Sequence, residues 1–160
     1  GIAGSDEKCL HATQQLGYDA CINRKTENIA QRLDELCPNG IDVFFDLVGG
    51  EILHLASERL AIGARVILCG LMAEYNKDTR SAGPPPGNWI KARAIVYGLV
   101  VYDFETRRDE FISECLPYVL DGRLKMPQDK TVGLETAPAA FCKLMRGENV
   151  GKAVVEVTAR

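Results

Sequence analysis

The chain has 160 residues, a length that suits one domain with a single sizeable core. Apolar residues make up 46% of the chain and charged residues 26%, which is ordinary for a globular protein, and the net charge of −3 disfavours a nucleic-acid surface or a polybasic membrane patch. No apolar run approaches the roughly 20 residues that a membrane helix needs, and no signal peptide is visible. We therefore expect a cytoplasmic protein that binds neither nucleic acid nor membrane.

The cysteines and histidines predict no metal site. Six cysteines are scattered without a Cys-x-x-Cys pair, whereas zinc ligands usually come in pairs two to four residues apart. Several lie inside apolar runs, as Cys69 does in "VILCG", and this is typical of buried reduced thiols. His11 and His54 stand alone in predicted helices, where surface exposure or core packing is the expected role.

Strands and helices alternate along the first 70 residues. In chain order, the sequence predicts a strand at "GIA", a helix from Asp6, a strand over 19–23, a helix over 27–37, a strand over 41–48, a helix after Gly50 and a strand over 64–70. The run "IDVFFDLV" over 41–48 is almost continuously apolar, as in a strand buried on both faces. This alternation predicts an α/β fold with a parallel sheet flanked by helices.

The alternation breaks after Gly70. Residues 71–89 are polar and contain three consecutive prolines at 84–86, which predicts a long loop that borders the substrate cleft or a subunit contact. The remaining predicted elements are a strand over 92–103, a helix with Thr106 as N-cap, a kink at Pro117 and a stop at Gly122, a helix over 136–147 with Phe141, Leu144 and Met145 at core spacing, and a strand over 151–157.

Five segments in register resemble the medium-chain dehydrogenase/reductase superfamily: "AGSDEK", "FDLVGG", "LCGLMAEYN", "GLVVYD" and "GENVGKAVV". The branch that the chain resembles is that of the zinc-independent prostaglandin reductases, or NADP-dependent alkenal double-bond reductases, and the resemblance covers essentially all 160 residues.

The resemblance implies a Rossmann-like parallel sheet that lacks its first strand and its glycine-rich turn, since the first predicted strand is reduced to "GIA" and no G-x-G-x-x-G occurs. We therefore expect a part of a longer polypeptide. Residues 1–123 are interpreted as a partial NADP-binding domain, and residues 124–160 as a segment that returns to the GroES-like catalytic domain. The resemblance also implies a homodimer and no zinc, because this branch lacks both zinc sites of its relatives.

The end of the first predicted strand favours NADP over NAD. By the resemblance, this first predicted strand corresponds to the second strand of a Rossmann sheet, which ends at the adenosine ribose. An NAD site presents a carboxylate there, whereas this chain presents Gly4 and Ser5. Lys8 is unfavourable in the first turn of a helix, but it becomes favourable beside a 2′-phosphate. Arg24 follows the neighbouring strand where the family usually has a tyrosine, and its guanidinium matches phosphate geometry. The alternative is that both cations are solvated surface charges.

Further cofactor contacts are implied by the resemblance alone. Glycines at the end of the strand over 41–48 allow close approach of the backbone, although Leu47 replaces the family's asparagine and its hydrogen bond. A plain turn or an ordinary apolar core is the alternative for most of these positions. The residues implied are Gly49, Cys69, Gly70 and Leu71, then Leu99, Val100 and Val101 along the carboxamide, and Asn149 at the nicotinamide half.

Tyr75 is the candidate catalytic residue, since the matching tyrosine of the family reaches the nicotinamide ribose and steers a proton to the enolate. Hydride addition to an α,β-unsaturated ketone builds charge on the carbonyl oxygen, which a phenol can stabilise. Its alternative role is that of a structural loop aromatic.

Three functions stay open. The first is the cofactor-binding part of an NADPH-dependent double-bond reductase acting on small enones such as oxo-prostaglandins, inactive alone. The second is a catalytically idle nucleotide-binding or interaction module. The third is a relative of the quinone reductases, over which the "YN" dipeptide favours the enone branch.

Overall fold

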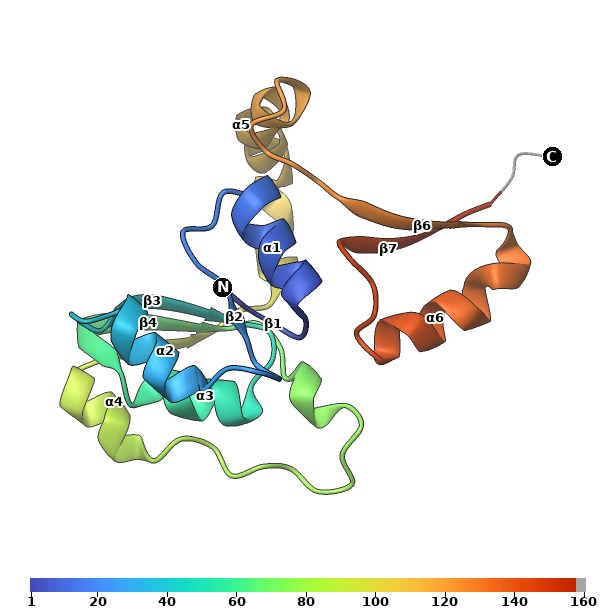
Figure 1. Ribbon diagram of the computed structural model, residues 1–160. Helices are drawn as coiled ribbons and strands as arrows, with labels where there is room; N and C mark the ends of the chain where they lie inside the picture. The colour runs from blue at the N-terminus through green and yellow to red at the C-terminus, as the bar shows by residue number, and fades with distance from the viewer. Residues whose placement is uncertain (158–160) are drawn as a thin grey trace. The chain divides into compact units, whose positions relative to one another are not determined.

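The computed structural model describes residues 1–157 and divides the chain into two units (Figure 1). Unit 1 joins Gly1–Lys25 to the segment that begins at Arg107, and unit 2 is Thr26–Thr106. No helix within the described residues has the length and apolarity needed to cross a membrane.

Unit 1 begins with a small parallel βαβ motif. Strands β1 (Ile2–Ala3) and β2 (Ile22–Asn23) pair in parallel, and helix α1 (Asp6–Gln15) connects them. The hydroxyl oxygen of Ser5 accepts a hydrogen bond from the amide of Lys8 (3.3 Å), which satisfies one of the unpaired donors of the first turn. The prediction that a helix begins at Asp6 is confirmed.

The rest of unit 1 contains a second parallel pair, in which Gln128 to Val132 are in register with Lys152 to Glu156. Its first strand was not predicted, because "QDKTV" has little apolar alternation and gains its pairing only from a strand some 20 residues away. The elements are α5 (Arg108–Leu120), β6 (Gln128–Val132), the 3₁₀ turn η3 (Leu134–Thr136), α6 (Ala137–Met145) and β7 (Lys152–Glu156).

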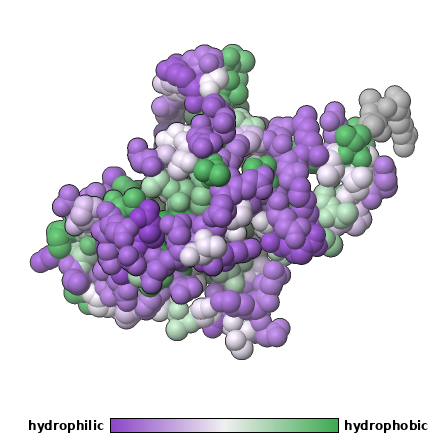
Figure 2. Space-filling model, in the orientation of Figure 1, coloured by the Kyte–Doolittle hydropathy of each residue, from purple (hydrophilic) through white to green (hydrophobic). Residues whose placement is uncertain are grey.

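Two predictions about these helices are wrong. Arg107, not Thr106, is the N-cap of α5, because the 3₁₀ turn η2 continues through Thr106 to Arg107 before the helix begins. On α6, Phe141 is 61% exposed and Leu144 and Met145 are 38% exposed each, so none of the three lies in a core. The two-stranded sheet offers this helix little surface to cover. Gly122 follows α5 with φ +79°, which confirms the predicted stop. Figure 2 shows α5 with an apolar and a polar side, both exposed.

Unit 2 is a three-stranded parallel sheet of order β3-β4-β5. The pairing aligns Phe44 with Val66 and Val66 with Val96. The elements are α2 (Ile29–Leu36), β3 (Ile41–Asp46), α3 (Gly50–Ser57), β4 (Leu60–Leu68), the 3₁₀ turn η1 (Met72–Glu74), α4 (Pro86–Ala92), β5 (Ile95–Gly98) and the 3₁₀ turn η2 (Val101–Arg107).

The sheet of unit 2 is covered on one face only. Helices α2, α3 and α4 gather on the same side of it (Figure 1), where Ala64 and Val66 are almost fully buried. On the opposite face Val43 is 50% exposed, Phe45 58% and Ile95 64%. The prediction that residues 41–48 are buried on both faces is therefore wrong, because consecutive right-handed crossovers place their helices on one side.

Two further boundaries differ from the prediction. Helix α4 begins at Pro86, inside the segment predicted as a loop, since proline lacks only a donor that the first turn leaves unpaired anyway. The strand predicted over 92–103 is confined to Ile95–Gly98, and the chain then turns into η2.

Candidate functional site

The ends of β1 and β2 bring Gly4 and Arg24 together. The amide of Arg24 donates to the carbonyl of Ala3 (2.9 Å), continuing the parallel ladder. The guanidinium lies over Gly4, where a Cβ atom would be 3.5 Å from Nη2 and 3.6 Å from Nε. Arg24 is exposed, and its side chain forms no ion pair within residues 1–157. An uncompensated guanidinium therefore stands at the end of β1, next to Ser5.

Lys8 points elsewhere. Its half-buried side chain donates from Nζ to the carbonyl oxygen of Gly147 (2.5 Å), just beyond the end of α6. The ammonium is thus neither loose in solvent nor paired with a carboxylate; it stabilises the C-terminal end of another helix.

A buried amide side chain, that of Asn23, was missed by the sequence analysis and organises the turn that contains Arg24. Asn23 is 3% exposed, and its Nδ2 donates to the Asp6 carboxylate (2.6 Å) while its Oδ1 accepts from the amide of Lys25 (3.0 Å). The negative charge of Asp6 is therefore engaged at the helix N-terminus. An asparagine directly before two cations at a strand end is the signal that could have identified it.

The end of β3 is shaped by a second missed residue, Asp46. The residue is 2% exposed, and its carboxylate accepts from the amides of Val48 (2.8 Å) and Gly49 (3.0 Å). Gly49 has φ +71°, and a Cβ there would lie 2.6 Å from Cδ2 of Leu71. Gly49 is thus required by local geometry as well as being a predicted cofactor contact. The signal was a carboxylate within an apolar run, since such a buried group needs hydrogen-bond donors.

The chain after β4 runs along the end of β3. The amide of Cys69 donates to the carbonyl of Asp46 (2.8 Å), and the amide of Met72 to that of Leu47 (3.1 Å). A Cβ on Gly70 would lie 3.1 Å from the carbonyl oxygen of Leu47. The structure therefore brings together four predicted cofactor residues: Gly49, Cys69, Gly70 and Leu71.

Tyr75 follows η1 and is 65% exposed, so its hydroxyl is accessible. The preceding residue, Glu74, closes the loop: its carboxylate accepts from the amide of Ser81 (2.8 Å) and from Nζ of Lys77 (3.2 Å). The Ser81 hydrogen bonds, followed by the Lys77 ammonium, hold the pKa of Glu74 below its ordinary value. The segment that carries Tyr75 is thus held by the contacts of Glu74 with Lys77 and Ser81, which we call the polar clamp.

The remaining predicted residues are divided between the units. In unit 2 the amide of Leu99 donates to the carbonyl of Leu68 (2.9 Å), and Val100 and Val101 are exposed. In unit 1 Nδ2 of Asn149 donates to the carbonyl of Gly151 (2.8 Å), within the turn between α6 and β7. Ser5, Lys8, Arg24 and Asn149 belong to unit 1 and the other predicted site residues to unit 2.

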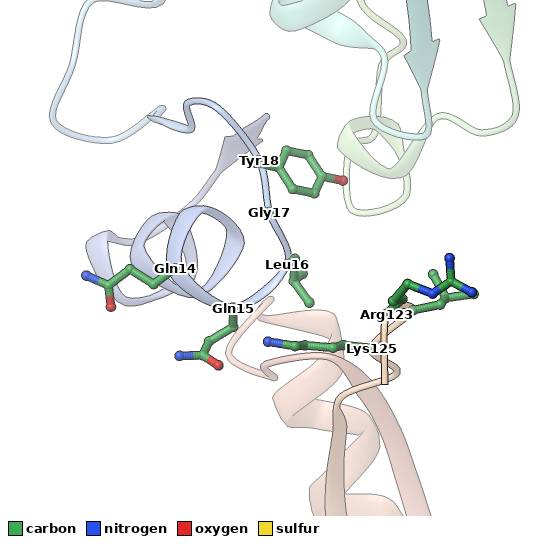
Figure 3. Close-up of a pocket in the computed structure, with 8 residues that line it drawn as sticks. Gln14, Gln15, Leu16, Gly17, Tyr18, Arg123 and Lys125 are labelled. Atoms are coloured by element: carbon green, nitrogen blue, oxygen red, sulfur yellow. The ribbon is translucent and has the colours of Figure 1, made fainter. Parts of the chain in front are cut away.

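A pocket of about 480 Å³ lies in unit 1 (Figure 3). Gln14–Tyr18, at the end of α1, form one wall and Arg123–Lys125 the other. Arg123 is paired with Asp121 (2.7 Å) and stacks on the Tyr118 ring (4.3 Å). No predicted site residue lines this pocket.

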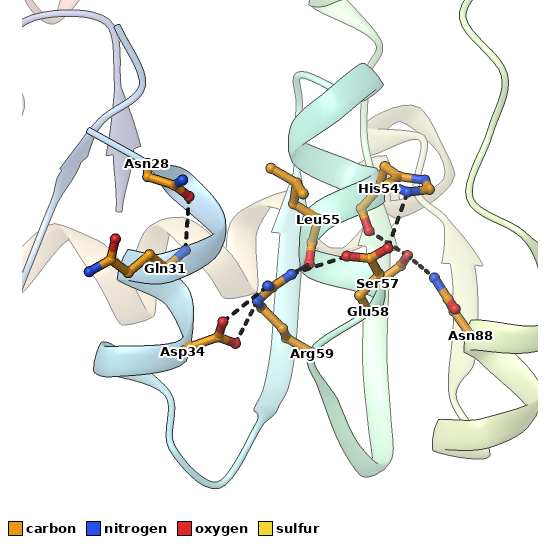
Figure 4. Close-up of polar contacts among 9 residues, drawn as sticks. All are labelled: Asn28, Gln31, Asp34, His54, Leu55, Ser57, Glu58, Arg59 and Asn88. Carbon is orange, nitrogen blue, oxygen red and sulfur yellow. Dashed lines mark hydrogen bonds and ion pairs between the residues drawn. The ribbon is translucent and has the colours of Figure 1, made fainter. Parts of the chain in front are cut away.

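The two histidines differ in their surroundings. His54 on α3 lies 3.3 Å from Glu58 in a network that also joins Ser57 to Asn88 of α4 and Arg59 to Asp34 of α2 (Figure 4). Nε2 of His11 is buried with no hydrogen-bond partner in the described structure.

Within residues 1–157 no group of three histidine, cysteine, aspartate or glutamate side chains is arranged to hold a metal ion, and no disulfide links the cysteines.

Comparison with known proteins gives a consistent picture. Residues 16–155 match the family described as zinc-binding dehydrogenase. The chain is 34% identical to the NADPH-dependent curcumin reductase of Escherichia coli, over 98% of this chain and 47% of that protein. It is 36% identical to prostaglandin reductase 1 of Bos taurus, over 98% and 48%. The chain thus spans about half the length of the curated relatives it matches.

The solved structures agree with these relatives. The structure of CurA from Vibrio vulnificus in complex with NADPH superposes with a TM-score of 0.91 at 35% identity, covering 100% of this chain and 49% of that one. A quinone oxidoreductase from Pseudomonas syringae shares the fold at a TM-score of 0.81 and 20% identity, over 98% of this chain and 48% of that one.

Proposed function

Because this chain belongs to the medium-chain dehydrogenase/reductase superfamily, in the zinc-independent branch of prostaglandin and curcumin reductases, we propose that it is the cofactor-binding part of an NADPH-dependent reductase. The proposed reaction is reduction of the C=C bond of a small α,β-unsaturated ketone. The names of the relatives support it, since one is an NADPH-dependent curcumin reductase and another a prostaglandin reductase. The two relatives are 34% and 36% identical to this chain, and each match extends over 98% of it.

The observation that carries the proposal is the guanidinium of Arg24 over Gly4. A 2′-phosphate needs cationic donors, room beside the backbone and no competing carboxylate. Arg24 supplies the donors, Gly4 leaves the room, and the Asp6 carboxylate is already bound by Asn23. The Ser5 hydroxyl accepts from the Lys8 amide and keeps its own hydrogen for an anion. The residues present therefore fit the adenosine 2′-phosphate of NADP.

The nicotinamide end is proposed for the residues gathered after β4. Bound NADPH supplies a hydride for the β-carbon of the enone. The exposed hydroxyl of Tyr75 then donates a hydrogen bond to the carbonyl oxygen as negative charge develops there, without introducing a charge of its own. The backbone of 69–71 and of 99–101, together with Asn149, is proposed to orient the cofactor.

The domain assignment stays part of the proposal. The two sheets that lie within residues 1–123 are parallel, which supports a Rossmann-like NADP-binding domain over that range. Residues 124–160 are proposed to belong to the GroES-like catalytic domain, and the complete enzyme to be a cytoplasmic homodimer that holds no metal.

Titration with NADPH and NADH, followed by fluorescence, tests the phosphate site. We expect NADPH to bind more tightly, and Arg24→Gln to weaken NADPH binding by roughly tenfold while leaving NADH unchanged, because only NADPH carries the phosphate that the guanidinium contacts. Lys25→Gln is the matched control, a neighbouring exposed cation. Equal affinity for the two cofactors in the unmodified chain contradicts the proposal.

The second candidate is a module that binds NADPH without catalysing turnover. Oxidation of NADPH in the presence of a simple enone separates the two. We expect no turnover by the 160 residues alone and turnover by a complete enzyme that contains them.

A further inference from the structure

The ammonium of Lys8 lies between two helix ends of opposite polarity. It is in the first turn of α1, beside amides that disfavour a cation, and it reaches the carbonyl of Gly147, past the last turn of α6, where a cation is favoured. The contact joins residues 139 positions apart within unit 1. This contact explains why a lysine is found in the first turn of α1: its positive charge is stabilised by the C-terminal end of α6.

The turn that Lys8 contacts, Gly147–Gly151, is ordered by several hydrogen bonds. The amide of Glu148 donates to the carbonyl of Lys143 (3.1 Å), and the amide of Val150 to the Asp129 carboxylate (3.2 Å). The Lys143 ammonium and the Val150 amide, with a smaller effect of the Lys8 charge, hold the pKa of Asp129 below its ordinary value. Two cations and a carboxylate thus surround this turn.

The close packing of the turn leaves it little freedom. The amide of Lys152 donates to the carbonyl of Pro127 (2.9 Å), and a Cβ on Gly151 would lie 2.4 Å from that same oxygen. Asn149 is held inside the turn by its bond to Gly151. A contact that fixes Gly147 therefore fixes the direction in which Asn149 is presented.

We infer that Lys8 is a positioning residue that links the two ends of the cofactor site: its ammonium holds the Gly147–Gly151 turn through the carbonyl of Gly147, and its backbone amide donates to the Ser5 hydroxyl in the proposed phosphate notch of Ser5 and Arg24. The inference rests on the proposed function for its second half. An ammonium has three donors, and Gly147 uses one of them. A phosphate beside Ser5 takes another, so the phosphate and the ordered turn stabilise each other by the same coupling free energy.

Amide hydrogen exchange followed by NMR tests the first half without any ligand. Lys8→Met removes the charge and keeps much of the apolar stem, and we expect the amides of Glu148, Val150 and Lys152 to exchange roughly fivefold faster, because the turn loses a charge-assisted bond. Lys8→Arg, which retains a cationic donor, restores much of the protection. Lys125→Met, an exposed lysine of the same unit, leaves these amides unchanged. Unchanged exchange in Lys8→Met overturns the inference, as does an equal effect in Lys125→Met.

Adenosine 2′,5′-bisphosphate tests the second half, with adenosine 5′-monophosphate as the control that lacks the 2′-phosphate. In the unmodified chain the bisphosphate slows exchange of the same three amides severalfold, and in Lys8→Met it does not. If it shifts Ser5 and Arg24 but leaves the turn unaffected, the link through Lys8 is wrong while the proposed phosphate site stands. If it does not bind, the proposed phosphate site fails and with it this second half, whereas the ligand-free comparison still decides whether Lys8 positions the turn.

Discussion

The two strand-end regions of this protein use their glycines and polar groups in opposite ways. At the ends of β1 and β2, Gly4 faces the far end of a flexible arginine at ordinary contact distance, and the guanidinium has no ion-pair partner in the part of the chain that the structure describes. At the ends of β3 and β4, Gly49 adopts φ +71°, a conformation that side chains rarely adopt, a Cβ there would lie 2.6 Å from the terminal Cδ2 of Leu71, and the amides of Val48 and Gly49 are bound by Asp46.

The difference separates groups that maintain the fold from groups left available to a ligand. Asp46 satisfies buried amides, so its removal costs stability first. The Arg24 side chain forms no hydrogen bond or ion pair within residues 1–157, so its removal costs little stability and affects what the chain can bind. Strained or closely packed glycines at a strand end do not by themselves indicate a cofactor.

The largest expected effect is on the β3 side. Asp46→Ala leaves the amides of Val48 and Gly49 without their acceptor in a buried position, and we expect the free energy of unfolding to fall by about 3 kcal/mol. Urea denaturation measures it. Asp42→Ala, at an exposed position of the same strand, should cost less than about 0.5 kcal/mol. Equal losses in the two variants would remove the contrast between the regions.

A pair of glycine substitutions sharpens the comparison. Gly49→Ala places a side chain at φ +71° and against Leu71, and we expect a loss of about 1–2 kcal/mol in the free energy of unfolding. Gly4→Ala meets Arg24 at 3.5 Å, an ordinary contact, so stability changes by less than about 0.5 kcal/mol while NADPH binding weakens. Thermal melting and cofactor titration on both variants measure this. A destabilised Gly4→Ala with unchanged NADPH binding would reverse the assignment.

The smallest expected effect is a pH dependence in the loop that carries Tyr75. The pKa of Glu74 is lowered from 4.5, so the carboxylate stabilises the folded loop at pH values above 4.5, and the contribution is lost as the pH falls through the lower folded pKa. The NMR shift of the Ser81 amide, which donates to Glu74, should therefore titrate with a midpoint below 4.5. Glu74→Gln should abolish this titration, and a midpoint at or above 4.5 contradicts the clamp.

Local patterns predicted most of the secondary structure. The capped start of α1, the strands within residues 19–23 and 41–48 and the stop at Gly122 follow from residues within a few positions of each other. The strand predicted over 64–70 is confirmed only in part, since β4 begins already at Leu60. Strand β6 was missed because its polar sequence becomes a strand only by pairing with β7. Helix α4 was missed because three prolines were interpreted as a loop, although the third is the first residue of the helix.

The candidate site could be predicted only in part. Parallel strands place their carboxyl ends at the same edge, so the proximity of Arg24 to Gly4 could be anticipated from the order of the elements. The contacts of Asp46, Asn23 and Glu74 could not be anticipated. Each depends on which groups come within about 3 Å of the side chain once the chain has folded.

The sequence by itself determined the family, the parallel α/β character and the positions of the chemistry-bearing residues, because these depend on residue identity and on short-range periodicity. Only the tertiary structure decided where the Lys8 ammonium goes, which face of the β3–β5 sheet is covered, and which glycine is constrained by packing. The long side chain of Lys8 can reach partners far apart in the sequence. Its partner here is the carbonyl of Gly147 beyond the C-terminal end of α6, and this partner comes within reach only once the tertiary structure has formed.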